Sequence, residues 1–321
     1  MLKISACIKL SQGQIGVISG HGGTRLSMSW HALLPLPSVW CGIASIGFSV
    51  FLFSLLDYVL RGVHPPIVVE CKGALAVWKW RNMIISWIHA VVIGTWDILC
   101  FYYYPELLDN PVDHVVPFTY FMVALSTGYF YYDFWDMITQ KQVFKMWELT
   151  LHHVAVLGAF TYNVLTVRYI AYTVIALLAE VNSIFLHTRK LMQMHKLHPM
   201  STPRRLTAVV NLITFAGCRG FALFRITYGM YMTPDKMSPF YAALLMTSML
   251  IMNILNPILF YILLRNDFLL PRKEDKIHCI SNGTNLTDYS SDKRKTSAYS
   301  VTYELNGFTG GRFHQPHPSE L

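Results

Sequence analysis

Long apolar stretches alternate with short polar segments along most of this chain of 321 residues. A helix needs about 20 apolar residues to cross the roughly 30 Å hydrocarbon core of a bilayer. Seven stretches approach or exceed that length: 38–60, 82–104, 115–138, 149–165, 169–187, 207–231 and 239–264. A six-span alternative drops the first stretch or merges the fourth with the fifth. The pattern therefore predicts an all-α, polytopic membrane bundle of six to seven transmembrane helices.

Basic residues follow every second stretch. The loops after the first, third, fifth and seventh stretches carry Arg61, Lys72, Lys79 and Arg81; Lys141 and Lys145; Arg189, Lys190, Lys196, Arg204 and Arg205; and Arg265, Arg272, Lys273 and Lys276. The other loops carry only Arg168 and Lys236. Because basic loops stay in the cytoplasm, we expect residues 1–37 to be extracytoplasmic and 38–60 to be the first transmembrane helix. Residues 269–321 are expected to form a disordered cytoplasmic tail.

The composition is that of a membrane protein and argues against nucleic acid as a partner. Hydrophobic residues make up 53% of the chain and charged residues 14%, against about 25% charged residues in soluble domains. The net charge of +8 does not indicate nucleic-acid binding, because Lys and Arg lie at the ends of apolar stretches. The six cysteines form no short-spaced cluster. We therefore expect neither a disulfide framework nor a metal site, and no cofactor.

Ionisable side chains inside the apolar stretches give the main functional clue, because burying them in a membrane is costly. Asp133 and Asp136 lie three residues apart near the cytoplasmic end of the third stretch, so they share a helical face. Glu148 and His152 share a face of the fourth stretch at the same depth, and His153 is rotated about 100° from His152. The two adjacent histidines are therefore expected to differ in role.

Three further polar residues lie in the fifth and sixth apolar stretches. Glu180 and Asn182 fall in the inner half of the fifth stretch, and Arg219 falls near the middle of the sixth. We expect opposite charges to pair across helices, Asp133 or Asp136 with a histidine and Glu180 with Arg219. Each residue also has a purely structural interpretation. The candidates for a lipid or acyl site are Asp133, Asp136, Glu148, His152, His153, Glu180, Asn182 and Arg219.

Aromatic residues cluster where the second apolar stretch begins and ends. Trp78, Trp80 and Trp87 lie near its start, and the tyrosines at 102–104 lie at its end. Because Trp and Tyr concentrate at membrane–water interfaces, we expect these residues to form interfacial belts.

Several motifs, taken in order, resemble the TLC domain. They are Gly128-Tyr129-Phe130-x-x-Asp133-x-x-Asp136, Trp147-Glu148-x-x-x-His152-His153 and Ala179-Glu180-Val181-x-x-Ile184-Phe185-Leu186. The flanking motifs are similar to the subgroup that contains TLC domain-containing proteins 1 and 2. These are Trp78-Lys79-Trp80-Arg81-Asn82 and Leu264-Arg265-x-Asp267-Phe268. The resemblance covers residues 74–268.

The resemblance implies a role in membrane lipids. The TLC domain is shared by ceramide synthases, translocating-chain-associated membrane proteins and several lipid-linked proteins. Resemblance to the subgroup implies a regulator that limits the incorporation of polyunsaturated acyl chains into phospholipids, and so controls membrane fluidity and lipid homeostasis. It implies membrane lipids (phospholipid or acyl-CoA) as partners. The plasma membrane is the implied location, with the endoplasmic reticulum as the alternative.

Two other functions stay open. In ceramide synthases, the paired histidines that match His152 and His153 belong to the catalytic motif, which implies an acyl-CoA-dependent N-acyltransferase as an alternative. Those enzymes also carry a later His-Asp-x-x-Asp pattern, where this chain has Leu178-Ala179-Glu180-Val181-Asn182. This departure, together with the lack of an activity attached to the subgroup, favours a protein that is not an enzyme. The third possibility is a structural partner of a channel or lipid enzyme.

Overall fold

The structure is a computed structural model that describes residues 37–109, 111–198 and 201–269, together with 280–281 and 299–300. The N-terminal segment 1–37 and the tail 269–321, for which we made predictions, lie almost wholly outside the described residues. The short strands β1 (Ile280–Ser281) and β2 (Tyr299–Ser300) pair antiparallel.

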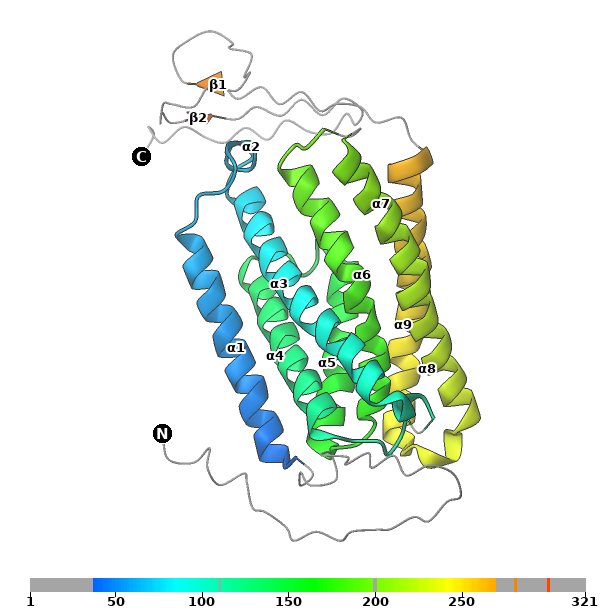
Figure 1. Ribbon diagram of the computed structural model, residues 1–321. Coiled ribbons are helices and arrows are strands. Elements are labelled where there is room, and N and C mark those ends of the chain that lie inside the picture. Colours follow the sequence, from blue (N-terminus) through cyan, green and yellow to red (C-terminus); the bar gives the residue numbers. More distant parts are fainter. Residues whose placement is uncertain (1–36, 110, 199–200, 270–279, 282–298, 301–321) are drawn as a thin grey trace, which may run out of the picture.

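The rest of the described chain is helical, which confirms the predicted all-α bundle. Long helices run side by side and alternate in direction (Figure 1). They are α1 (Val39–Arg61), α3 (Ala74–Tyr103), α4 (Pro117–Thr139), α5 (Trp147–Thr166), α6 (Ile170–Met194), α7 (Thr202–Thr214) continuing through the π-helical η4 (Phe215–Arg219) into α8 (Gly220–Met232), and α9 (Pro239–Leu264) continuing into η6 (Arg265–Leu269). The short elements α2 (Ile67–Glu70), η3 (Pro105–Leu108) and η5 (Pro234–Lys236) lie in connections.

Each of the seven predicted stretches corresponds to one of these long helices, but the helices differ in apolarity. Five of them are long and apolar enough to cross a membrane: α1, α3, α6, the α7–α8 unit and α9 with η6. Helices α4 and α5 have 23 and 20 residues but are less apolar. The turn between α5 and α6 has positive φ angles at Val167 and Tyr169, so these two helices are separate and the merged alternative is wrong.

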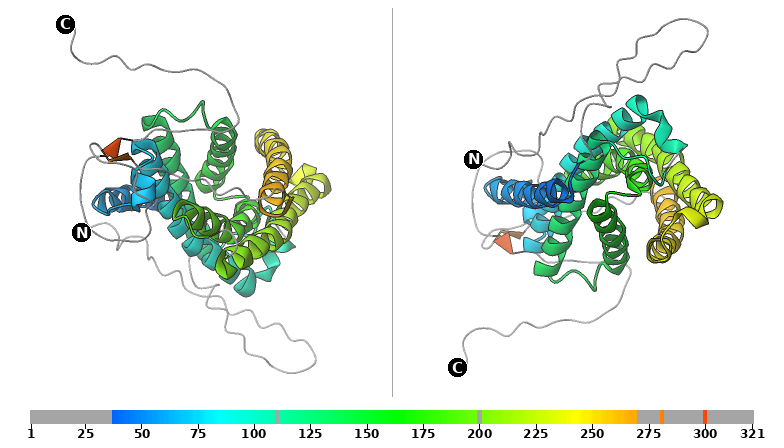
Figure 2. Two further views of the ribbon diagram at one scale, coloured as in Figure 1. Left: turned by 90° about the horizontal axis from the view of Figure 1, so that it is seen from above. Right: turned by 90° about the horizontal axis from the view of Figure 1, so that it is seen from below.

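The helices pack around a central pair. Helices α3 and α6 lie against each other along much of their length, and α1 packs mainly on α4. A Cβ atom on Gly94 of α3 would lie 3.1 Å from the backbone nitrogen of Val181 of α6, so the lack of a side chain allows this close approach. Helix α1 and the α7–α9 group lie at opposite sides of the bundle (Figure 2).

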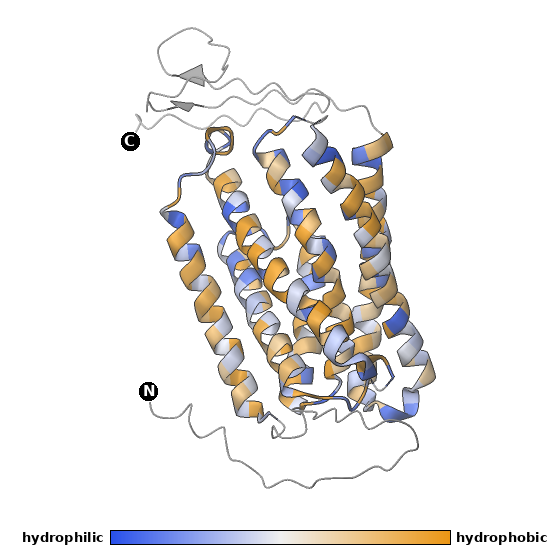
Figure 3. Cartoon of the chain, viewed as in Figure 1, coloured by the Kyte–Doolittle hydropathy of each residue, from blue (hydrophilic) through white to orange (hydrophobic). Residues whose placement is uncertain are grey.

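The alternating directions gather the basic loops at one end of the bundle. Hydrophilic residues colour the ends of the helices, and apolar residues cover most of their length (Figure 3). Cys41, Cys100 and Cys218 are not in a disulfide bond. Cys71 is disulfide-bonded, although the spacing of the cysteines had led us to expect no disulfide framework.

Two tryptophans expected in an interfacial belt instead lie inside the protein. Trp78 and Trp80 are buried, and their indole N–H groups donate to Asp136 Oδ2 (2.6 Å) and His195 Nε2 (3.2 Å). Position near a helix end does not by itself show whether an indole faces lipid, because buried polar acceptors on a neighbouring helix compete for its N–H group. Tyr102, by contrast, is 75% exposed.

Candidate lipid site within the bundle

A buried carboxyl–imidazole contact joins α4 to α5. His153 Nε2 lies 2.8 Å from Asp133 Oδ2, and its Nδ1 lies 2.8 Å from the Leu149 carbonyl oxygen. A carbonyl oxygen can only accept, so Nδ1 carries a hydrogen. The contact between Nε2 and the carboxyl group therefore holds one further proton between the two residues. Both nitrogens of this histidine are engaged within the protein.

The neighbouring histidine is held differently. His152 Nδ1 lies 3.4 Å from Met252 Sδ on α9. Because the thioether is a weak acceptor, this contact places the hydrogen on Nδ1 and leaves a lone pair on Nε2. Among the described residues, Nε2 has no hydrogen-bond partner, and the side chain is only partly buried. His152 is thus the member of the pair that keeps a free nitrogen.

The two aspartates share one partner on α3. Asn82 Nδ2 donates to Asp133 Oδ1 at 2.6 Å and lies 3.4 Å from Asp136 Oδ2. Asp136 also accepts from the Trp78 indole. Asn82 stood at the end of a motif that resembles the subgroup, but nothing in its sequence position indicated that it would link the two carboxyl groups.

Glu148 lies away from this cluster. It is in the first turn of α5 and is exposed. An acid there is stabilised by the helix dipole and remains hydrated. The i, i+4 spacing correctly indicates that Glu148 lies one turn before His152, but α5 begins at Trp147, so Glu148 lies too close to the helix end to be enclosed.

Glu180 pairs with a histidine that was not among the candidate residues. His89 Nδ1 lies 3.6 Å from Glu180 Oε2, and His89 Nε2 lies 3.1 Å from Ser126 Oγ. The imidazole also stacks on Tyr129 with ring centroids 3.7 Å apart. The expected pairing of Glu180 with Arg219 is therefore replaced by one between α6 and α3, because the close packing of these helices brings His89 nearer.

Arg219, at the end of the π-helical segment η4, has only neutral hydrogen-bond partners among the described residues. Its Nε donates to Asn182 Oδ1 at 2.8 Å, Nη1 to Asn256 Oδ1 at 3.1 Å and Nη2 to Ser183 Oγ at 3.0 Å. Asn182 is fully buried and its amide also donates to Asn211. Asn256 was not among the predicted candidates, although a polar residue in the last apolar stretch was a usable signal.

Asp97 is a further residue that was not among the candidates. Its side chain is fully buried in α3, and neither carboxyl oxygen has a hydrogen-bond partner among the described residues. Across the part of the chain that the structure describes, no group of three His, Cys, Asp or Glu side chains could hold a metal ion.

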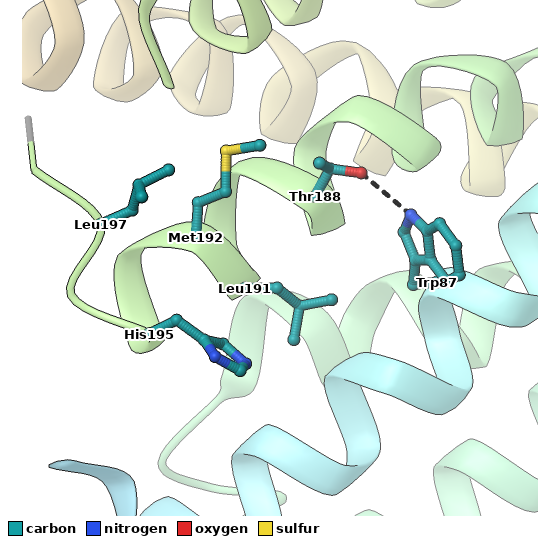
Figure 4. Close-up of a pocket in the computed structure, with 6 residues that line it drawn as sticks. All are labelled: Trp87, Thr188, Leu191, Met192, His195 and Leu197. Atoms are coloured by element: carbon teal, nitrogen blue, oxygen red, sulfur yellow. Dashed lines mark hydrogen bonds between the residues drawn. The ribbon is translucent and has the colours of Figure 1, made fainter. Parts of the chain in front are cut away.

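An apolar hollow of about 320 Å³ lies between α3 and the end of α6, separate from the histidine pair. Figure 4 shows its lining, which is Trp87, Thr188, Leu191, Met192, His195 and Leu197. The Trp87 indole donates to Thr188 Oγ1 at 2.9 Å across it. This hollow is open to the outside of the bundle, whereas the paired histidines face α4 and α9.

The fold and these contacts define a polytopic helical membrane protein with a layer of paired acids and histidines inside the bundle. The chain belongs to the TLC domain family, because the model of that family matches residues 79–265. The matched region runs from α3 to the start of η6 and contains every candidate residue.

Curated relatives agree with this assignment. TLC domain-containing protein 2 of Danio rerio is 34% identical over 235 residues, which cover 73% of this chain and 94% of that protein. TLC domain-containing protein 1 of Mus musculus is 31% identical, over 70% of this chain and 90% of that protein. TLC domain-containing protein 1 of Homo sapiens is 29% identical, over 66% and 86%. No solved structure matches the chain.

Proposed function

We propose that this protein regulates the acyl composition of membrane phospholipids by binding a lipid beside His152. In this proposal it limits the incorporation of polyunsaturated chains and so keeps the membrane less fluid. The observation that carries the proposal is the unequal histidine pair. His153 is engaged at both nitrogens, whereas the partly accessible His152 keeps a free Nε2.

The geometry supports a site and not only helix association. Side chains that serve helix association alone are expected to use their hydrogen-bonding capacity within the protein. Asp133 and His153 do so, but His152 Nε2 does not. An acceptor nitrogen that remains available at membrane depth suits a lipid hydroxyl or amine.

The test measures phospholipids in cells that lack related proteins. Cells expressing the wild-type chain and fed a polyunsaturated fatty acid should contain less polyunsaturated phosphatidylethanolamine than empty-vector cells, by mass spectrometry. His152→Gln should abolish this difference at equal protein level. His198→Gln, in the loop between α6 and α7, is the matched control and should preserve it. An effect that survives His152→Gln would exclude this site.

An N-acyltransferase is the second candidate, and the same free nitrogen supports it. Here His152 Nε2 accepts a proton as an amine nitrogen attacks the thioester carbonyl carbon of acyl-CoA. The new bond is the amide, the carbon–sulfur bond breaks, and the proton passes to the CoA thiolate. Purified protein with acyl-CoA and an amine lipid should then release CoA in a 1:1 ratio with amide. If neither CoA nor amide is released while cellular phospholipids still change, the acyltransferase is rejected and the regulator is retained.

The preferred location is the plasma membrane, with the endoplasmic reticulum as the alternative. Imaging of a tagged chain beside markers of both membranes would decide between them.

A third possibility, a structural partner of a channel or lipid enzyme, predicts that His152→Gln has no effect on lipids.

A further inference from the structure

Among the described residues, Arg219 is a cation inside the bundle that forms no ion pair with an acid. Asp133 is matched by His153, and Glu180 by His89. Arg189 pairs with Asp267 nearer the helix ends. Among the described residues, Arg219 forms no ion pair with an acid, and its three hydrogen bonds go to two amide oxygens and one hydroxyl group.

The guanidinium group also keeps unused donors. It has five N–H groups, and three of them are used. The two that remain belong to Nη1 and Nη2, which form the planar fork that suits a carboxylate or phosphate. Arg219 as a residue is partly buried and not fully enclosed.

The local backbone and neighbours hold the group in place. Arg219 ends the π-helical segment Phe215–Arg219, and such single wide turns are frequent at functional sites. Asn182 Oδ1 orients Nε, while its own amide is fixed by Asn211. Glu180 acts on Arg219 electrostatically without a direct contact, and Glu180 itself contacts His89. A cation whose direct partners are all neutral is costly inside a membrane, and an anion that joins it lowers that cost.

The same face of α9 connects Arg219 to the histidine pair. Asn256 accepts from Arg219, and Met252 contacts His152. These two residues are four apart in α9, so they lie on one face about 6 Å apart along the helix. Arg219 and His152 therefore adjoin one strip of α9, which one lipid can contact at both positions.

We infer that Arg219, held by Asn182 and Asn256, binds the oxyanion of a lipid, a carboxylate or a phosphodiester, beside His152. The inference rests on the proposed function in that it uses the same lipid site and names the group that the site recognises. The anion neutralises the guanidinium group, and its two oxygens accept from Nη1 and Nη2. The adjoining His152 then lies next to the polar end of that lipid.

The experiment is equilibrium binding to the full-length protein in maltoside micelles, which contain no phosphate or carboxylate. The probes are radiolabelled oleate, lysophosphatidylethanolamine and oleyl alcohol, which share a long chain and differ in the polar group. Saturable binding of oleate identifies a carboxylate, and binding of the lysophospholipid identifies a phosphodiester. Oleyl alcohol should bind at least tenfold more weakly. Equal binding of all three probes would overturn the inference.

Variants then assign the site. Arg219→Gln should weaken binding of the preferred anion at least tenfold, and Arg219→Lys should weaken it less because it keeps the charge but loses the fork. Arg168→Gln is the matched control, because Arg168 pairs with Asp113 in a loop and is half exposed. Unchanged affinity in Arg219→Gln would overturn the inference. If that variant does not fold, the Arg219→Lys result and the probe comparison decide.

The binding assay and the cellular assay can reject the anion site and the proposed regulator independently of each other. Anion binding that needs Arg219, with no change in cellular phospholipids, would retain the anion site and reject the proposed regulator. A phospholipid change that needs His152, without preferential anion binding, would retain the regulator and reject the anion site.

Discussion

Two polar contacts inside the bundle differ in how completely their hydrogen-bonding groups are satisfied within the protein. At the α4–α5 contact, Asp133 and His153 use each other, Asn82 and the Leu149 carbonyl group. At the α6–η4–α9 contact, Arg219 has only neutral hydrogen-bond partners and unused donors. The first contact is complete without a ligand and the second is not. A polar residue at membrane depth thus indicates a site only when its partners leave some bonding capacity unused.

The largest expected effect tests the complete contact. Asp133→Leu leaves the His153 imidazole without its acid in a buried position, which should lower the free energy of unfolding by about 3 kcal/mol. His153→Leu should cost a similar amount, and the double variant should cost much less than the sum of the two. Chemical unfolding in micelles measures these differences. The control Glu148→Gln changes an exposed acid and should have little effect. Additive costs would mean that the pair does not act as a unit.

A smaller loss of stability is expected when the ion pair that joins α6 to the end of α9 is removed. Arg189 donates to Asp267 through Nε (2.5 Å) and Nη2 (2.6 Å), and both side chains are over nine-tenths buried. Asp267→Asn should lower the free energy of unfolding by about 2 kcal/mol. It should also weaken anion binding, because η6 continues α9, which carries Asn256. Asp235→Asn, on an exposed loop, should change neither quantity. Full affinity in Asp267→Asn would show that the anion site does not depend on this anchor.

The next smaller effect on stability is expected from a substitution between α1 and α4. A Cβ atom on Gly128 would lie 2.5 Å from the Ile46 carbonyl oxygen and 2.5 Å from Ser49 Cβ. Gly128→Ala should therefore cost about 1–2 kcal/mol through overpacking. Gly47→Ala on α1 meets no atom within 4 Å and should be neutral or slightly stabilising. Both are measured by the same unfolding assay, and equal behaviour of the two variants would contradict the close approach. Anion binding should persist in both variants, since Arg219 lies across the bundle.

The smallest expected effect is the pH dependence of stability that comes from a histidine outside the spanning helices. Burial lowers the pKa of His114 below its ordinary value, and its Nε2 has no partner among the described residues. The unfolded chain then binds more protons at acidic pH, so stability contributed by this residue is lost as the pH falls below about 6.5. Between pH 7.5 and 5.5, the melting temperature of wild type should fall about 1–2 °C more than that of His114→Gln. Identical pH profiles would place the pH sensitivity in the helical layer instead.

Much of the architecture could be predicted because it depends on one-dimensional patterns. Apolar stretches of membrane length and alternating basic loops specify the helices and their alternating directions, as α1 and α9 illustrate. The boundaries were less certain. Helix α3 begins at Ala74 and not at 82, and α6 continues to Met194 and not to 187. Polar residues at these helix ends are stabilised by neighbouring helices, which a hydropathy pattern does not include.

The candidate residues were partly predictable for the same reason. Their presence in apolar stretches identified Asp133, His153 and Arg219, because each is costly at membrane depth. Spacing on one helix could not identify their partners. Asn82, His89 and Asn256 lie on other helices and are separated from those partners by long stretches of chain.

The sequence by itself determined that this chain is a helical membrane protein with an acid–histidine layer, since length, apolarity and loop charge act locally along the chain. Only the tertiary structure decided which members of that layer are satisfied. Hydrogen bonds and ion pairs depend on distances of about 3 Å between helices, and those distances follow from packing. Packing placed His153 against Asp133, placed Glu180 against His89, and left His152 and Arg219 with the unused capacity that defines the candidate site.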